Sequence, residues 1–181
     1  MAALKYSPAQ TILFDEEKGR FDTFIPCHPE MLCNIGTTLI SFKDGVLYTH
    51  DTDTEYNTFF GVTSDSYVTA VFNKAENVVK TFKATELLAS EKWDFPEIET
   101  SSNEYGTTKQ QSNLIEADFN EFEGKYNAVF LGASNSIGGI NNGSTLKGNF
   151  VTIKIRKQNP THLVSLSSIA VSSIESKLNL K

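Results

Sequence analysis

The sequence has few residues that could cross-link the chain or bind a metal. Among its 181 residues there are two cysteines, three histidines and one tryptophan. Five residues separate Cys27 from Cys33, a spacing that fits neither a CxxC redox pair nor a zinc ligand set. We therefore expect two buried free thiols rather than a disulfide, and we expect no metal and no cofactor.

Long apolar runs are also missing. No stretch approaches the roughly 20 apolar residues that a membrane-spanning helix needs, so we expect no membrane span. The first residues, MAALKYSP, contain no basic segment followed by an apolar one, so a secretory signal is not expected. We interpret residues 1–10 as a short leader and residues 1–181 as one domain, for which this length is ordinary.

Basic charge is scarce, with 16 Lys and Arg against 22 Asp and Glu and a net charge of −6. A general nucleic-acid binder needs a basic face, so we do not expect one here. The charge is unevenly distributed, because the segment from Lys147 to the end carries +5 and the remainder −11. Such a division would suit head-to-tail packing between identical subunits.

The chain is rich in apolar residues that recur with a period of two, which is typical of strands with one buried face. Val151, Ile153 and Ile155 give the clearest example. An Asp-Gly turn between residues 38–42 and 46–50 predicts a tight hairpin, and Gly19 lies in the turn of a second hairpin between residues 12–14 and 21–25. Further strands are expected at residues 66–72, 79–84, 94–100 and 126–131. The fold class that this pattern predicts is all-β, an antiparallel β-sandwich with at most one or two short helices.

Several segments depart from this simple pattern. The apolar register shifts at Ser167-Ser168, which predicts a β-bulge. Residues 75–88 contain good helix formers, but their β-branched content favours a strand. Asp118 and Glu121 resemble a capping box, so one short helix ending near Gly124 is expected. Residues 101–112 and 133–144 are predicted to be loops because of their polar and glycine-rich composition.

Two segments resemble ligand-binding loops only in part. Residues 138–145 have the glycine spacing of a phosphate-binding loop, but Ser144 stands where the lysine is required, so a surface loop is favoured. Residues 50–55 have alternating acids like the start of an EF-hand loop, without its glycine or distal glutamate, which favours a solvated acidic turn.

No catalytic residues can be assigned from the sequence. Cys27 precedes His28, but neighbours in a strand or turn point apart, so a turn at residues 26–29 is favoured over a thiol nucleophile. An acid pair of a glycosidase remains open, since nothing selects two of the 22 acids. Some aromatic residues could form a carbohydrate-stacking face, although core positions are favoured: Tyr48, Tyr56, Phe59, Phe60, Trp93 and Tyr105.

Six segments, taken in order, carry a family resemblance: FDEEKGRFDTF (14–24), SFKDGVLYTH (41–50), NTFFG (57–61), VFN (71–73), VKTFK (79–83) and EGKY (123–126). The set resembles the C-terminal region of virion structural proteins of tailed bacteriophages, especially the tail muzzle (nozzle) proteins of crAss-like podoviruses. It extends from about Ile12 to Lys125 and more loosely to the end. Phe21 replaces a tryptophan that is usual in the family, and Tyr126-Asn127 replaces a Trp-Phe pair.

The resemblance implies a non-enzymatic component of a phage tail, made in the bacterial cytoplasm and located in the virion. Its implied partners are other tail proteins and copies of itself in a ring. Members of the family are far longer, so the chain is a separated domain, a fragment or a stand-alone relative. A carbohydrate- or receptor-binding β-sandwich, with a glycan or host receptor as partner, and a hydrolase with an unrecognised acid pair remain the alternatives.

Overall fold

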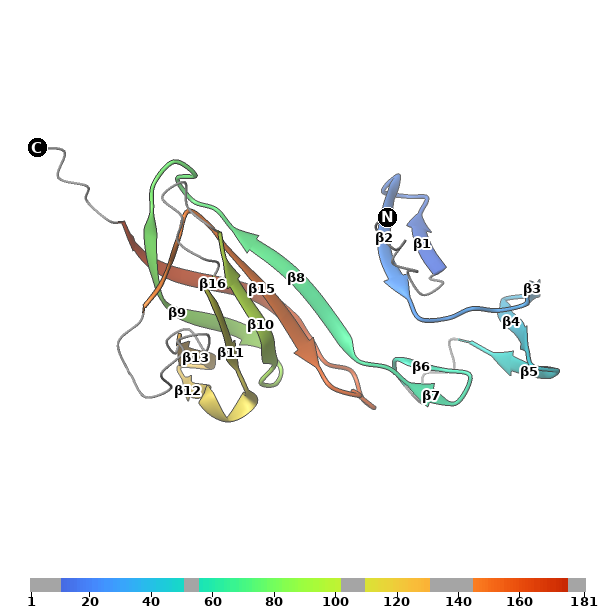
Figure 1. The fold of residues 1–181 in the computed structure, drawn as a ribbon. Helices are drawn as coiled ribbons and strands as arrows, with labels where there is room; N and C mark the ends of the chain where they lie inside the picture. Colours follow the sequence, from blue (N-terminus) through green and yellow to red (C-terminus); the bar gives the residue numbers. More distant parts are fainter. Residues whose placement is uncertain (1–10, 51–55, 102–109, 131–144, 176–181) are drawn as a thin grey trace, which may run out of the picture. The chain divides into compact units, whose positions relative to one another are not determined.

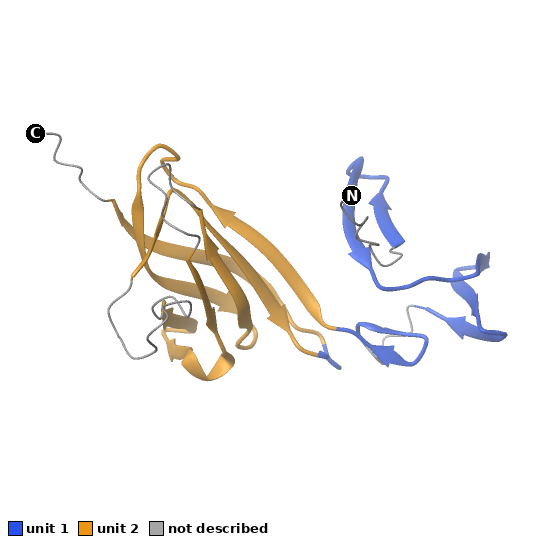
Figure 2. Cartoon of the chain, viewed as in Figure 1, with its two compact units in different colours: residues 1–64, 159–162 blue, residues 65–158, 163–181 orange. Residues whose placement is uncertain are grey.

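The computed structural model describes residues 11–50, 56–101, 110–130 and 145–175. These residues divide into two compact units (Figure 2). Unit 1 comprises residues 1–64 and 159–162, and unit 2 comprises residues 65–158 and 163–181. The single domain expected from the sequence stays a prediction, and the expected leader lies outside the described residues. Within the described ranges, no helix has the length and apolar character needed to span a membrane.

The described part of unit 1 contains three small antiparallel sheets (Figure 1). Their strands are β1 (Thr11–Asp15) with β2 (Arg20–Ile25), β3 (Met31–Ile35) with β4 (Thr38–Lys43) and β5 (Val46–Thr49), and β6 (Thr58–Phe59) with β7 (Val62–Thr63). Both predicted hairpins, β1–β2 and β4–β5, are confirmed. In the second, Asp44 and Gly45 both adopt positive φ, 50° and 77°, as a type I′ turn requires.

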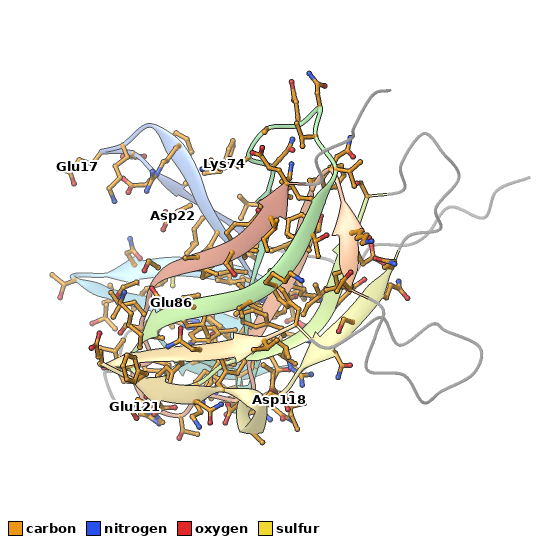
Figure 3. The ribbon with its side chains drawn as sticks, turned by 90° about the vertical axis from the view of Figure 1, so that its left-hand side faces the viewer. Glu17, Asp22, Lys74, Glu86, Asp118 and Glu121 are labelled. Atoms are coloured by element: carbon orange, nitrogen blue, oxygen red, sulfur yellow. The ribbon has the colours of Figure 1, made fainter. Side chains whose placement is uncertain are left out.

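Unit 2 is built from two larger antiparallel sheets. The four-stranded sheet has the order β11 (Gln111–Leu114), β10 (Asp94–Thr100), β15 (Val151–Lys157) and β8 (Ser66–Phe72). The five-stranded sheet contains β12 (Asn120–Phe122), β13 (Lys125–Val129), β9 (Lys80–Ala89), β14 (Leu146–Gly148) and β16 (Leu166–Glu175). Strand β16 pairs along the whole length of β9, so β13 and β14 share the other edge of β9. Figure 3 shows β16, β9, β13 and β12 side by side in this order.

A hydrophobic core fills the space between these two sheets. Val151, Ile153 and Ile155 of β15 are fully buried, as their alternation predicts. They belong to a cluster with Phe82 and Leu87 of β9 on the facing sheet. The remaining members are Trp93, Phe95, Ile98, Leu114, Phe119, Ala128, Phe130 and Leu146. The β-rich, sandwich-like fold class predicted from the sequence is confirmed.

Register shifts adjust the sheets to this core. The pairing of β16 with β9 shifts between Leu166 and Ser168, which confirms the bulge predicted at Ser167-Ser168. A second shift in this pair leaves Lys83 of β9 without an opposite residue. Because of that extra residue, Phe82 and Thr85 both point inward although they are three positions apart. The predicted strands at residues 66–72 and 94–100 have these bounds, whereas the one expected at 79–84 extends to Ala89.

The short helix predicted between Asp118 and Gly124 is wrong. Only residues 116–118 form a turn of 3-10 helix, and a β12–β13 hairpin follows. Glu123 and Gly124 both have positive φ, 51° and 73°, and close a tight turn that a helix cannot contain. Phe119 is 1% exposed and Phe122 is 67% exposed, so the two rings do not share the face that a helix would give them.

The two predicted loops fall largely outside the described residues. Residues 102–109 and 133–144 are not described. Gln111 and Ser112, which the sequence assigns to the first loop, instead belong to β11 and pair with Glu99 and Ile98. Their polar side chains favoured a loop in the sequence. The strand forms nevertheless, because strands pair through backbone N–H and C=O groups, which do not depend on side-chain polarity. The strand predicted at residues 126–131 is found as Lys125–Val129.

Candidate functional site

Unit 1 leaves most of its apolar side chains in solvent. In the described residues between 11 and 64, only Cys27 and Ser41 are buried. The exposed apolar and aromatic side chains there are Ile12, Leu13, Phe14, Phe21, Phe24, Met31, Leu32, Ile35, Leu39, Val46, Leu47, Tyr56 and Val62. Many exposed apolar side chains within one segment are suited to contacts with a partner. We call these side chains the apolar hairpin surface.

The β1–β2 hairpin shows why the surface is exposed. Ile12, Leu13 and Phe14 are consecutive in β1, so their side chains alternate between the two faces of the hairpin. Phe14 packs edge-to-face on Phe21 with 5.1 Å between ring centroids, yet Phe21 remains 72% exposed. A two-stranded hairpin has no second layer with which to cover either face, and such hairpins are marginally stable alone.

Unit 2 has two long strand edges that are also available for protein contacts. In the described residues, β8 pairs with β15 alone and β16 with β9 alone, so one edge of each strand has no partner. Strand β8 contains no charged residue and no proline, the usual features that discourage edge pairing. Its Val68 and Val71 side chains are exposed. These edges are templates for the addition of another strand.

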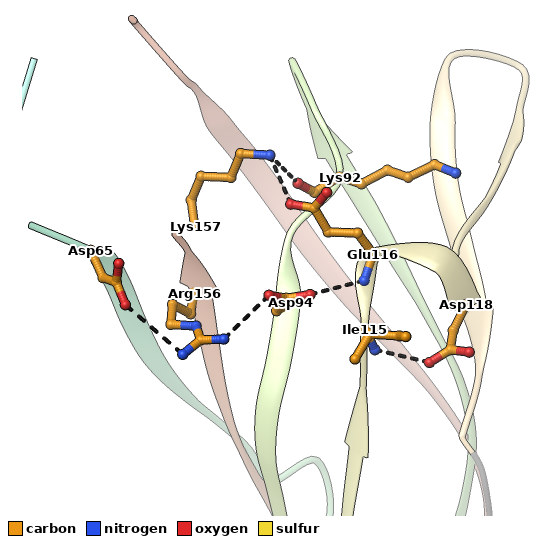
Figure 4. A network of polar contacts seen from close by, with 8 residues as sticks. All are labelled: Asp65, Lys92, Asp94, Ile115, Glu116, Asp118, Arg156 and Lys157. Atoms are coloured by element: carbon orange, nitrogen blue, oxygen red, sulfur yellow. Dashed lines mark hydrogen bonds and ion pairs between the residues drawn. The ribbon is translucent and has the colours of Figure 1, made fainter. Parts of the chain in front are cut away.

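A network of ion pairs lies on unit 2 (Figure 4). The Lys157 ammonium is 2.8 Å from Glu116 and 2.9 Å from Glu91. The Arg156 guanidinium is 3.4 Å from Asp94 and 3.9 Å from Asp65. Asp94 in turn accepts a hydrogen bond of 2.9 Å from the backbone N–H of Glu116. Two of the C-terminal basic residues are therefore paired within the chain.

Burial and pairing have opposite effects on the lysines of unit 2. Burial tends to lower the pKa of Lys157, but its hydrogen bonds to Glu116 and Glu91 outweigh burial and raise that pKa above its ordinary value. Lys80 is buried and donates to the carbonyl of Ala75 at 2.7 Å, and burial lowers its pKa. Both lysines therefore bind groups of unit 2 itself.

The cysteines are free, as the sequence predicts, but they differ in burial. Cys27 is buried, and burial raises the pKa of its thiol. Cys33 on β3 is only partly buried, so the expectation of two buried thiols is wrong for this residue. Its strand belongs to a three-stranded sheet that has no second layer within the described residues of unit 1. Cys27 and His28 lie in a stretch without regular structure before β3, and the turn expected at residues 26–29 stays a prediction.

One serine and one histidine in unit 1 have the spacing of a nucleophile and its base. The Ser41 hydroxyl and His50 Nε2 are 2.6 Å apart. Ser41 is fully buried between β3 and β5, however, so a substrate could not reach its hydroxyl. The pair fastens the β4–β5 hairpin to the residue that follows it, and the His50 ring stacks edge-to-face on Phe60 with 6.0 Å between centroids.

The other candidate residues are dispersed. Trp93 is buried in the core of unit 2, whereas Tyr48 and Phe60 pack on each other in unit 1 with 5.0 Å between centroids. Tyr56 is exposed in unit 1, and Tyr105 lies outside the described residues, as do residues 51–55 of the acidic turn and 138–144 of the glycine-rich loop. The described residues contain no group of three or more potential metal ligands.

The apolar hairpin surface was not predicted from the sequence, although one signal was available. A strand with one wet face alternates polar and apolar residues, whereas Ile12-Leu13-Phe14 and Met31-Leu32 place apolar side chains on both faces. Such strands need cover on both sides. The pattern marks a surface that the chain alone does not cover.

Comparison with known proteins supplies a family match. No curated protein matches the chain. A family model covers residues 54–132, which include β6 to β13 and four of the six segments that carry the resemblance. The segments at residues 14–24 and 41–50 lie before the matched region. Residues 54–132 match the family of the Crassvirus muzzle protein C-terminal domain, which confirms the family resemblance expected from the sequence.

Proposed function

We propose that this chain is a non-enzymatic structural component of a bacteriophage tail, of the muzzle or nozzle type. It assembles as a ring with copies of itself and with other tail proteins, and it reaches the virion after synthesis in the bacterial cytoplasm. The family match over residues 54–132 supports the tail assignment. The apolar hairpin surface supports a role that depends on protein contacts.

The exposure of this surface is the observation that carries the proposal. Burying one large apolar side chain is worth about 1.5–3 kcal/mol. Phe21 and Phe24 are 72% and 62% exposed, so a partner that buries them gains a large share of that free energy. Aromatic side chains are also enriched at the centre of protein interfaces, where a few residues supply most of the binding energy.

The charge difference between the C-terminal segment and the remainder contributes less to packing between subunits than the sequence implies. Arg156 and Lys157 form ion pairs with acids of unit 2, so they are not available to a neighbouring subunit in their present arrangement. We therefore assign the assembly chiefly to apolar contacts. Among the described residues, β8 and β16 each have one edge that pairs with no other strand. Because the two edges belong to different strands, pairing one with the other is a heterologous contact, which generates a ring when its rotation closes.

The test compares the oligomeric state of three proteins by sedimentation velocity and light scattering across protein concentrations. The wild-type chain is expected to self-associate. The double variant F21S/F24S is expected to weaken association at least about tenfold, since it removes two apolar contacts. Phe122→Ser is the matched control, because Phe122 is 67% exposed on unit 2 and lies outside the apolar hairpin surface.

Salt separates the two modes of assembly. Apolar association persists or strengthens as ionic strength rises, whereas ionic association weakens. Association that disappears in moderate salt and is unchanged in F21S/F24S would refute the apolar mode. A wild-type chain that stays monomeric at high concentration in both low and high salt would count against the assembly itself.

A further inference from the structure

A polar groove lies on the solvent face of the four-stranded sheet of unit 2, apart from the apolar hairpin surface. Its cavity volume is about 490 Å³, and residues from all four strands line it. Tyr67 comes from β8, Lys154 and Arg156 from β15, Glu97 from β10, and Gln111 and Asn113 from β11. A volume of this order is typical of small-molecule sites in proteins.

Strand register explains why these side chains share one face. In β15 the residues Val151, Ile153 and Ile155 point into the core, so Lys154 and Arg156 point outward. Arg156 is opposite Tyr67 on one side and Asp94 on the other, and Lys154 is opposite Glu97. Cross-strand neighbours lie close enough for direct contact.

A bulge in β10 shapes the groove. The register of β10 shifts between Phe95 and Ile98 with respect to β11, and between Asp94 and Glu97 with respect to β15. Phe95 and Ile98 are both fully buried, so the two residues between them, Pro96 and Glu97, face the groove. Bulges commonly redirect side chains at binding sites, which is their effect at this position.

The groove holds its charged groups in fixed and balanced positions. Arg156 is anchored between Asp94 at 3.4 Å and Asp65 at 3.9 Å (Figure 4). Lys154 Nζ lies 5.2 Å from the centroid of the Tyr67 ring, a cation–π distance. Asp65 and Glu97 balance the two basic residues of the lining, and Asp94 adds a third acid beside Arg156. A polyanion is disfavoured here, because the acids outnumber the basic residues.

The Tyr67 ring supplies an apolar platform within this polar lining. Its side chain remains 59% exposed although Lys154 lies over the ring, so ring surface is available to a ligand. The Asn113 amide offers both donors and acceptors and Glu97 offers acceptors, whereas the Gln111 amide already donates to Glu99. A ligand that fits must combine an apolar face with groups that donate and accept hydrogen bonds, and it must not be anionic.

We infer that this groove binds a neutral saccharide, with a sugar ring on Tyr67 and its hydroxyls on Asn113 and Glu97. A pyranose ring has the required chemistry, since its C–H groups form an apolar face and each hydroxyl both donates and accepts. Every residue of the groove belongs to unit 2 and none to the apolar hairpin surface, so saccharide binding is tested separately from the apolar contacts of assembly, although Tyr67 lies on β8, whose edge the proposed ring also uses.

The test begins with the full chain on an array of immobilised neutral, sialylated and sulfated oligosaccharides, followed by calorimetric titration with the neutral oligosaccharide that binds best. Wild type is expected to bind neutral glycans. Tyr67→Ala should weaken binding by about tenfold or more, because it removes the stacking platform. Tyr67→Phe should stay within about threefold of wild type, because it keeps the ring.

Phe122→Ala is the matched control, since Phe122 is an exposed aromatic residue of unit 2 that lies outside both the groove and the apolar hairpin surface. It should bind like wild type, and each variant is checked for a wild-type circular dichroism spectrum. No binding to any glycan on the array overturns the inference, as does a folded Tyr67→Ala variant that binds glycans like wild type. Binding restricted to sialylated or sulfated glycans overturns it too.

Discussion

Unit 2 encloses Phe95, Ile98 and Ile153 between two sheets, whereas unit 1 leaves Phe21 and Phe24 in solvent. Both units consist of short antiparallel strands with similar turns, so secondary structure does not explain the difference in burial. The number of packed layers explains it. Two facing sheets cover one another, while the separate hairpins of unit 1 each need a surface from elsewhere. One chain thus combines a domain that holds its own core with a segment whose apolar groups remain available to partners.

The largest difference between the units is expected from removing one aromatic ring in each. Phe95→Ala should lower the free energy of unfolding of unit 2 by about 3–5 kcal/mol, because Phe95 is fully buried against Phe119. Phe21→Ala should change it by less than about 0.5 kcal/mol. Trp93, the single tryptophan of the chain, lies in the core of unit 2, so its fluorescence during urea unfolding reports on this unit. Equal shifts of the urea midpoint would show that the contrast is wrong.

A second test compares one lysine ion pair of unit 2 with one of unit 1, both 2.8 Å long. Lys157 is largely buried and pairs with Glu91 and Glu116, whereas Lys18 is mostly exposed and is 2.8 Å from Asp15 in the β1–β2 turn. Lys157→Met should cost about 1–2 kcal/mol in urea unfolding, because it leaves two partly covered carboxylates without their cation. Lys18→Met, the control, should cost close to nothing, as exposed pairs do.

The same pair predicts a pH dependence. Because the folded-state pKa of Lys157 is raised above the ordinary 10.5, its stabilisation is complete below about pH 10.5 and is lost as pH rises through the folded-state pKa. Urea midpoints of wild type and Lys157→Met should therefore converge in strongly alkaline solution. A difference that stays constant from pH 7 to the alkaline end would contradict the assignment.

A smaller effect is expected from two glycines in equivalent turns. Gly124 in unit 2 and Gly45 in unit 1 both adopt positive φ, and neither has an atom within 4 Å of the position that a Cβ would occupy. Alanine at either position therefore costs only backbone strain, about 1 kcal/mol. Gly124→Ala should shift the tryptophan-detected unfolding transition by that amount. Gly45→Ala should leave the transition in place, and a shift comparable to that of Gly124→Ala would mean that the units unfold together.

The smallest expected effect is a difference in the labelling rates of the two thiols, and it involves no change in the stability of the chain. Iodoacetamide should label Cys33 faster than Cys27 in the native chain, because Cys27 is buried and burial raises its pKa. Raising the pH should accelerate labelling of Cys27, and urea should abolish the difference. Peptide mass spectrometry measures both rates. Equal rates in the native chain would show that even Cys27 lacks cover.

Local chemistry could be predicted where a single segment contains the whole cause. The Lys43-Asp44-Gly45 turn is confirmed because the positive φ that it needs is favoured by these residue types. The Ser167-Ser168 bulge is confirmed because a register change leaves a visible break in alternation. By contrast, the helix predicted at Asp118–Gly124 failed, since Glu123-Gly124 suits a tight turn as well as a helix end and only the strand β9 beside β13 decides between them.

The sequence alone determined that this chain is β-rich, that its hairpins lie where turn residues interrupt apolar alternation, and that it resembles a phage muzzle family. Those features depend on neighbours in the chain. Only the tertiary structure decided that Arg156 and Lys157 pair internally, that Tyr67 shares a groove with Gln111 and Asn113, and that Phe21 is largely exposed. The physical reason is that burial and pairing depend on residues far away in sequence, which strand alternation cannot identify.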